Sequence, residues 1–321
     1  MHNWIWSCIG WNKKGAMNMK ASRALQSVLE YLPIKVRSSI IKLPPETQDQ
    51  IQEIRLRSCR PVGIRVNGME QILTLQGYLT KISSDGLLCS FEEIGQAFQA
   101  VCSYSVYSHE RDISEGYVTI RGGCRVGICG TASIQKNTPL TLRNISGLNF
   151  RIAGEFIGTS QQVWERISAE NAGILIAGSV GSGKTTFLRD LCRLIGNCYQ
   201  TSLVDERGEI AAVYRGVPMH DIGLKTDVLD GYPRSEGILT ALRVMTPQYI
   251  ICDEISTQND VQAILSAAGC GVNFAASCHA GNMDELLNRN VLRPLFDAKV
   301  FRHCVFLENN GHVRSVRRLI S

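Results

Sequence analysis

The stretch Gly178–Thr185 constrains this chain more than any other, because its residues Gly-Ser-Val-Gly-Ser-Gly-Lys-Thr fit the pattern G-x-x-x-x-G-K-[ST] of a phosphate-binding P-loop. The continuous apolar run before it, residues 173–177, is typical of a strand buried on both faces. In residues 186–195 after it, apolar side chains recur at helical spacing. Strand, loop and helix therefore stand in the order that the motif requires. A glycine- and serine-rich loop with a chance lysine is the minor alternative.

The chemistry of phosphate binding explains the residue types in this loop. Glycines let the backbone turn tightly and bring its N–H groups close to phosphate oxygens, and the following helix adds its partial positive charge. We expect Lys184 to reach the β- and γ-phosphates of ATP and Thr185 to offer its hydroxyl to Mg²⁺. The predicted nucleotide-binding residues are Gly178, Ser179, Val180, Gly181, Ser182, Gly183, Lys184, Thr185 and Thr186.

Length and charge limit the remaining possibilities. A chain of 321 residues is long enough for two domains. The net charge of +5 permits contact with nucleic acid or an acidic membrane surface but argues for neither. The 12 cysteines form no C-x-x-C pair and no zinc-ligand spacing, so we expect reduced thiols and no zinc.

We predict an α/β protein with four parts. Residues 1–20 form a poorly ordered leader, with translation starting at Met1, Met17 or Met19, and residues 21–140 form an α+β domain. Residues 141–170 form a linker with a connecting helix, and residues 171–321 form the P-loop domain.

Local signals in the α+β domain predict its elements. Asn67-Gly68 and Gly122-Gly123 each stand between two apolar runs, as in β-hairpins. Ser90 and Glu93 form a capping box that begins a helix. We expect further helices over residues 21–32 and after Pro44-Pro45, the second running through Ile51, Ile54 and Leu56.

Beyond the P-loop helix, three apolar strands each end in polar groups. Residues 202–204 lead to Asp205-Glu206, residues 249–252 lead to Asp253-Glu254, and residues 272–277 lead to Cys278-His279. In a parallel α/β sheet, ligands bind beyond the carboxyl ends of the strands. All three polar endings should therefore surround one nucleotide.

Asp253 and Glu254 have the form of a Walker B pair, in which acids follow an apolar strand. Asp253 would hold Mg²⁺, directly or through water, and Glu254 would orient and polarise the attacking water. Acids that merely cap a helix are the structural alternative. With a P-loop upstream, that alternative becomes the weaker interpretation.

The roles of the other polar residues near these strand ends are less specified. Glu206 could help to hold the water shell of the metal, and His279 could sense the γ-phosphate or be a structural histidine. Hydrolysis at P-loop sites often needs an arginine that stabilises the negative charge of the transition state. The candidate arginines are Arg207, Arg234 and Arg243 in the C-terminal half and Arg121 and Arg125 in the second hairpin.

Several longer sequence motifs resemble those of the stage III sporulation protein AA family. These motifs are distributed along most of the chain: residues 53–57 (Glu-Ile-Arg-Leu-Arg), 123–127, 142–146, 204–211, 214–218, 226–231 and 253–255. The resemblance extends to the ATPases of type II and type IV secretion and of pilus assembly. It implies a RecA-like domain, an Asp box at Asp205-Glu206 and a His box at His279.

The resemblance also implies a biological setting. It implies a cytoplasmic homo-hexamer with nucleotide at the subunit borders, peripheral to a membrane through the other proteins of a sporulation channel. The leading hypothesis is accordingly an Mg²⁺-dependent ATPase that drives or gates a secretion-like complex. The alternative is a RecA-like ATPase that handles nucleic acid. A small-molecule kinase has less support because no second substrate pocket is visible in the sequence.

Overall fold

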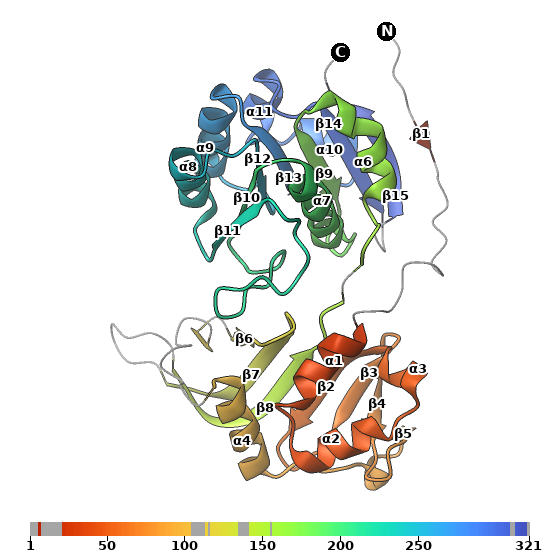
Figure 1. Ribbon diagram of the computed structural model, residues 1–321. Helices are drawn as coiled ribbons and strands as arrows, with labels where there is room; N and C mark the ends of the chain where they lie inside the picture. Colours follow the sequence, from red (N-terminus) through yellow and green to blue (C-terminus); the bar gives the residue numbers. More distant parts are fainter. Residues whose placement is uncertain are drawn as a thin grey trace. The chain divides into compact units, whose positions relative to one another are not determined.

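The computed structural model divides into two compact units, which we describe separately (Figure 1). The N-terminal unit comprises Asn18–Glu155 and the short segment Ala212–Met219. The C-terminal unit comprises Met1–Met17, Phe156–Ala211 and His220–Ser321. The residues that the structure describes are 6–7, 21–103, 113–114, 116–133, 141–154, 156–308 and 312–319.

The N-terminal unit is built on an antiparallel sheet with the order β5-β4-β3-β2-β8-β7-β6. Its helices α1, α2 and α4 cover one face of this sheet (Figure 1). The strands are β2 (Ile51–Arg57), β3 (Gly63–Val66), β4 (Met69–Leu73), β5 (Leu79–Thr80), β6 (Tyr117–Thr119), β7 (Arg125–Ser133) and β8 (Thr141–Arg151). The helices are α1 (Ala21–Leu29), α2 (Ile34–Ile41), α3 (Pro45–Gln48), the 3₁₀ turn η1 (Ser83–Asp85) and α4 (Phe91–Val101).

Three local predictions in this unit are confirmed. Asn67 and Gly68 both have positive φ, as a tight two-residue hairpin turn requires, and they join β3 to β4. The Gly122-Gly123 turn likewise lies between β6 and β7. Ser90 and Glu93 make both hydrogen bonds of the capping box at the start of α4.

Two predictions in this unit are wrong. Residues 51–57 form β2 and not a helix, because Ile54 and Leu56 alternate with charged residues and are buried on one face of the sheet. Residues 141–151 form β8, which lies between β2 and β7, and do not belong to a linker. Asn144 and Gly147 weaken the strand pattern of β8 in the sequence, and pairing on both sides compensates for this.

The C-terminal unit contains an eight-stranded sheet with the order β1-β15-β14-β9-β13-β12-β10-β11. The six strands from β14 to β11 in this order are parallel, whereas β15 and β1 add antiparallel at one side. The strands are β1 (Trp6–Ser7), β9 (Ile174–Gly178), β10 (Thr201–Asp205), β11 (Thr226–Asp230), β12 (Tyr249–Cys252), β13 (Asn273–His279), β14 (His303–Glu308) and β15 (His312–Arg318). The helices are α6 (Gln161–Ile167), the 3₁₀ turn η3 (Ser168–Glu170), α7 (Lys184–Cys198), α8 (Arg234–Val244), α9 (Gln258–Gly269), α10 (Met283–Leu287) and α11 (Arg293–Asp297).

The register of this sheet brings its strand ends to one level. Val204 of β10 pairs with Cys252 of β12, which pairs with Ala276 of β13. Gly178, at the end of β9, pairs with His279 of β13. The acids that follow β10 and β12 therefore emerge at the edge of the sheet where the P-loop begins.

Thiols fill part of the core of this unit. Cys252 and Cys278 are fully buried, and burial raises the pKa of each thiol to about 12. Both thiols therefore remain protonated at neutral pH and pack as small apolar residues. None of the described cysteines forms a disulfide.

Close packing around Gly196 in α7 gives a first test of the fold. A Cβ at this position would lie 2.0 Å from Thr226 Oγ1 and 2.5 Å from the Ile222 carbonyl oxygen. We expect Gly196→Ala to lower the free energy of unfolding by about 1–3 kcal/mol, because the loop that carries Ile222 must move. Thermal unfolding followed by calorimetry measures the change.

Gly269→Ala is the matched control, since Gly269 also lies in a helix and a Cβ there would meet no atom within 4 Å. Equal effects of the two substitutions would contradict the packing of α7 against residues 222–226.

Candidate nucleotide-binding site

The P-loop joins β9 directly to α7. Gly181 and Gly183 have φ of 77° and 91°, a left-handed region that favours glycine, and Gly183 is the N-cap residue of α7. Lys184 and Thr185 therefore lie in the first turn of a 15-residue helix, where backbone N–H groups and the helix dipole attract anions. The Lys184 Nζ donates hydrogen bonds to the carbonyls of Gly178 (3.0 Å) and Ser179 (2.9 Å), so its ammonium lies over the loop.

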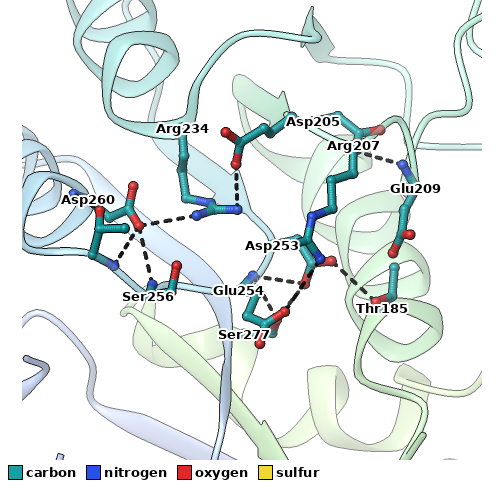
Figure 2. Close-up of polar contacts among 12 residues, drawn as sticks. Thr185, Asp205, Arg207, Glu209, Arg234, Asp253, Glu254, Ser256, Asp260 and Ser277 are labelled. Carbon is teal, nitrogen blue, oxygen red and sulfur yellow. Dashed lines mark hydrogen bonds and ion pairs between the residues drawn. The ribbon is translucent and has the colours of Figure 1, made fainter. Parts of the chain in front are cut away.

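The side chain of Thr185 meets the acid that follows β12. Thr185 Oγ1 donates a hydrogen bond to Asp253 Oδ2 at 3.3 Å (Figure 2). The structure thus brings together the two residues that the sequence predicts as magnesium ligands, although they lie 68 positions apart. A hydroxyl and a carboxylate are the hard oxygen donors that Mg²⁺ prefers, so this pair fits the predicted metal.

Ser277 holds the other oxygen of Asp253, and the sequence did not single it out. Its Oγ donates to Asp253 Oδ1 at 2.5 Å and accepts the backbone N–H of Glu254 at 3.0 Å. Ser277 is fully buried within β13, where its apolar neighbours conceal it in the sequence. A polar residue inside an otherwise apolar strand was the available signal, because buried hydroxyls need partners.

Glu254 lies at the open edge of this site. Its Oε2 is 3.7 Å from Arg207 Nη1 (Figure 2), and the Glu254 and Arg207 side chains are 41% and 62% exposed. Glu254 is therefore accessible to water beside the Thr185–Asp253 pair, while Arg207 supplies a positive charge from the loop after β10.

The acids of the predicted Asp box bind protein groups. Asp205 is 1% exposed, and its carboxylate accepts the backbone N–H groups of Glu209, Ile210 and Ala211 at 2.8–3.0 Å. Glu206 Oε2 lies 2.8 Å from Arg234 Nη2. Asp205 therefore shapes its own loop, and Glu206 is engaged by a buried arginine.

His279 lies beside the start of the P-loop. It is the last residue of β13 and pairs in register with Gly178 of β9. Its carbonyl accepts a hydrogen bond from Arg289 Nη1 at 2.7 Å. His279 is therefore half-buried and next to the phosphate-binding loop.

The five candidate arginines lie in different surroundings. Arg234 is buried in ion pairs, Arg243 bonds to Leu239 and Thr240 of its own helix, and Arg125 stacks on Tyr117 of the N-terminal unit. Arg121 precedes the Gly122-Gly123 turn of that same unit. Of the three in the C-terminal unit, Arg207 is the one that faces a Walker B acid.

A parallel sheet whose strand ends present a P-loop, a Walker B pair and a terminal histidine defines a RecA-like P-loop domain, which confirms the predicted fold class. Two solved structures share this fold: the ATPase DotB of Legionella pneumophila and the pilus retraction motor PilT with bound ADP. DotB gives a TM-score of 0.52 at 15% identity, covering 92% of this chain and 78% of its own. PilT gives a TM-score of 0.55 at 17% identity, and the match covers 89% of this chain and 81% of the PilT chain.

The chain belongs to the family described as "Sporulation stage III, protein AA", whose model matches residues 22–320. It is 32% identical over 284 residues to the stage III sporulation protein AA of Bacillus subtilis (strain 168), covering 86% of this chain and 89% of that relative. The family predicted from the sequence motifs is confirmed. Among the described residues, no helix is both long and apolar enough to cross a membrane.

The buried carboxylate of Asp205 gives a test of the loop geometry. We expect Asp205→Ala to lower the free energy of unfolding by about 2–4 kcal/mol, because three backbone N–H groups would lose a charged acceptor. Urea denaturation followed by circular dichroism measures this change.

Asp227→Ala is the control, because Asp227 is exposed and its carboxylate bonds to the exposed Gln200 side chain. Its expected effect is within about 0.5 kcal/mol. A loss at Asp205 no larger than the loss at Asp227 would contradict the structural role of Asp205.

Proposed function

We propose that this chain is an Mg²⁺-dependent ATPase that acts as the motor subunit of a larger assembly. The observation that carries the proposal is the contact between Thr185 and Asp253 at the N-terminus of the P-loop helix, with Glu254 exposed beside it. Membership of the sporulation family and a fold shared with DotB and PilT support it.

In the proposed mechanism, each residue of the site has a distinct role in hydrolysis. The amides of residues 178–186 and the Lys184 ammonium bind the phosphates, and Thr185 and Asp253 would hold magnesium. When bound, magnesium neutralises charge that develops on the β- and γ-phosphates. Ser277 orients Asp253 by a hydrogen bond, which leaves the second carboxylate oxygen facing Thr185.

Glu254 is the group best placed to act on water. It orients and polarises the water that attacks the γ-phosphate, which is the usual task of a carboxylate beside a Walker B aspartate. Arg207 Nη1 lies 3.7 Å from Glu254 Oε2, so it supplies a positive charge next to that carboxylate. His279, which pairs in register with Gly178, would report whether the γ-phosphate is present.

The wider proposal concerns what the motor drives. We propose a homo-hexameric ring in the cytoplasm, held at a membrane by other proteins of a sporulation channel, which the ring drives or gates. The support is the family, since the relative in Bacillus subtilis is a stage III sporulation protein, together with the fold shared with a pilus motor.

A nucleic-acid-handling ATPase has less support. The N-terminal unit has an open pocket of about 420 Å³ with Arg55, Arg57 and Arg60 in its lining. Two of these three arginines already bind a carboxylate of the same sheet: Arg55 binds Glu53 and Arg57 binds Glu70. Their positive charge is thereby partly neutralised, which does not favour phosphate backbones.

Substitutions at Lys184 and Glu254 test the proposal. We expect Lys184→Ala to lower the rate of ATP hydrolysis by at least about 10²-fold, because a positive charge on the phosphates is lost. Glu254→Gln should lower the rate by about 10²–10⁴-fold while ATP still binds, because the attacking water loses its base. Phosphate release measures the rate, and equilibrium binding of a fluorescent ATP analogue measures affinity.

Lys225→Ala and Glu236→Gln are the matched controls, because both residues are exposed and lie in the same unit. Both should hydrolyse ATP at the wild-type rate. Hydrolysis by Lys184→Ala at the wild-type rate would refute the P-loop site, and the same result for Glu254→Gln would refute the role of that residue alone.

A further inference from the structure

Arg234 is a buried cation beside the proposed site that the hydrolysis mechanism leaves without a role. It is the first residue of α8 and is 6% exposed. Its Nη2 lies 2.8 Å from Glu206 Oε2. Its Nη1 lies 3.2 Å from Asp260 Oδ2 (Figure 2). A charge so deeply buried is costly unless it is paired on several sides, and the two carboxylates provide that pairing.

The two carboxylates are connected to different loops of the site. Glu206 follows β10, next to Arg207. Asp260 lies in the first turn of α9, and its Oδ2 accepts the backbone N–H groups of Ser256 (3.2 Å) and Thr257 (3.0 Å). Arg234 therefore connects the loop after β10 to the loop that begins with Asp253 and Glu254.

These loops carry the two side chains that meet at the open edge. Arg207 is adjacent to Glu206 in sequence, and Glu254 lies two residues before Ser256. The distance of 3.7 Å between Arg207 Nη1 and Glu254 Oε2 thus depends on how the two loops are held relative to one another. Both side chains are substantially exposed, so their own packing does not fix this distance.

The planar guanidinium of Arg234 is well suited to connect Glu206 and Asp260. Its two Nη atoms point in fixed directions, so it can bind one carboxylate on each side in a defined geometry, which a lysine ammonium cannot do. In Figure 2 the labelled Arg234 and Asp260 lie on one side of Glu254, and Arg207 lies on the other. The network therefore lies beside the loop that carries Glu254.

We propose that Arg234 is a positioning residue for ATP hydrolysis: by binding Glu206 and Asp260 together, it sets the geometry of Glu254 against Arg207. The inference rests on the proposed ATPase function. It gives Glu206 the role of a fixed anchor and not that of a group on the metal. Its effect should fall on the hydrolytic step, since the P-loop residues that bind nucleotide lie outside the network.

The test uses the full chain with Arg234→Met, Arg234→Lys and Glu206→Gln. We expect Arg234→Met to lower kcat by about 10- to 100-fold, as misplaced catalytic groups do, with ATP affinity changed by less than about twofold. Arg234→Lys should give an intermediate kcat. Glu206→Gln, a milder change because its side chain is 37% exposed, should lower kcat in the same manner, and the double variant should be no worse than Arg234→Met.

Amide hydrogen exchange provides a readout that does not depend on hydrolysis. Loss of the network should speed exchange in peptides covering residues 205–211 and 254–260, with the P-loop peptide unchanged. Glu236→Gln is the control on α8, because Glu236 is exposed on the same helix, and it should leave both kcat and exchange unaltered.

Several results would overturn the proposal. These are a wild-type kcat for Arg234→Met, exchange unchanged in both loops, or additive losses in the double variant with Glu206→Gln. An equal loss of ATP affinity and kcat would also overturn it, since Arg234 would then act on nucleotide binding. If the wild-type chain hydrolyses no ATP, the proposed function fails, and hydrogen exchange alone decides whether Arg234 connects the two loops.

Discussion

The contact between Thr185 and Asp253 is the interaction on which the site depends. Thr185 is held by the N-terminus of α7, and Asp253 is held by the end of β12 and by Ser277 of β13. Three elements of the parallel sheet and its helices thus fix the positions of two oxygens. Because parallel strands end at the same edge, the fold itself assembles these donors, and small local changes in the loops can adjust their chemistry.

Around this contact, each buried charged group has its own polar or oppositely charged partners. Asp205 is surrounded by backbone N–H groups, and Arg234 is held between Glu206 and Asp260. The buried ion pairs of Arg234 cost desolvation energy and contribute little net stability, so we attribute to them a role in fixing geometry. Glu254 and Arg207 differ from these groups because both remain exposed, as groups that must meet water and phosphate should be.

Local signals made much of the fold predictable. The P-loop, the Asn67-Gly68 hairpin and the Ser90 capping box are each determined by a few adjacent residues. The alternation of Ile54 and Leu56 with charged residues was also a local signal for strand β2, and the helix prediction overlooked it. The strand β8 has a weaker pattern, because its stability comes from pairing with β2 and β7. The partners of Asp253 were partly predictable: the Walker B pattern indicates Thr185, whereas nothing adjacent to Ser277 in sequence points to Asp253. The binding of Glu206 by Arg234 has no sequence signal, because the two residues meet only through the packing of α8 on the sheet.

A structure of the full chain with a non-hydrolysable ATP analogue and Mn²⁺, with the metal located by its anomalous scattering, tests the central claim most directly. We predict one metal ion beside the γ-phosphate, with Thr185 Oγ1 as a direct ligand and Asp253 bound to the ion or to one of its waters. A bound analogue whose metal lies away from both Thr185 and Asp253 would contradict the account.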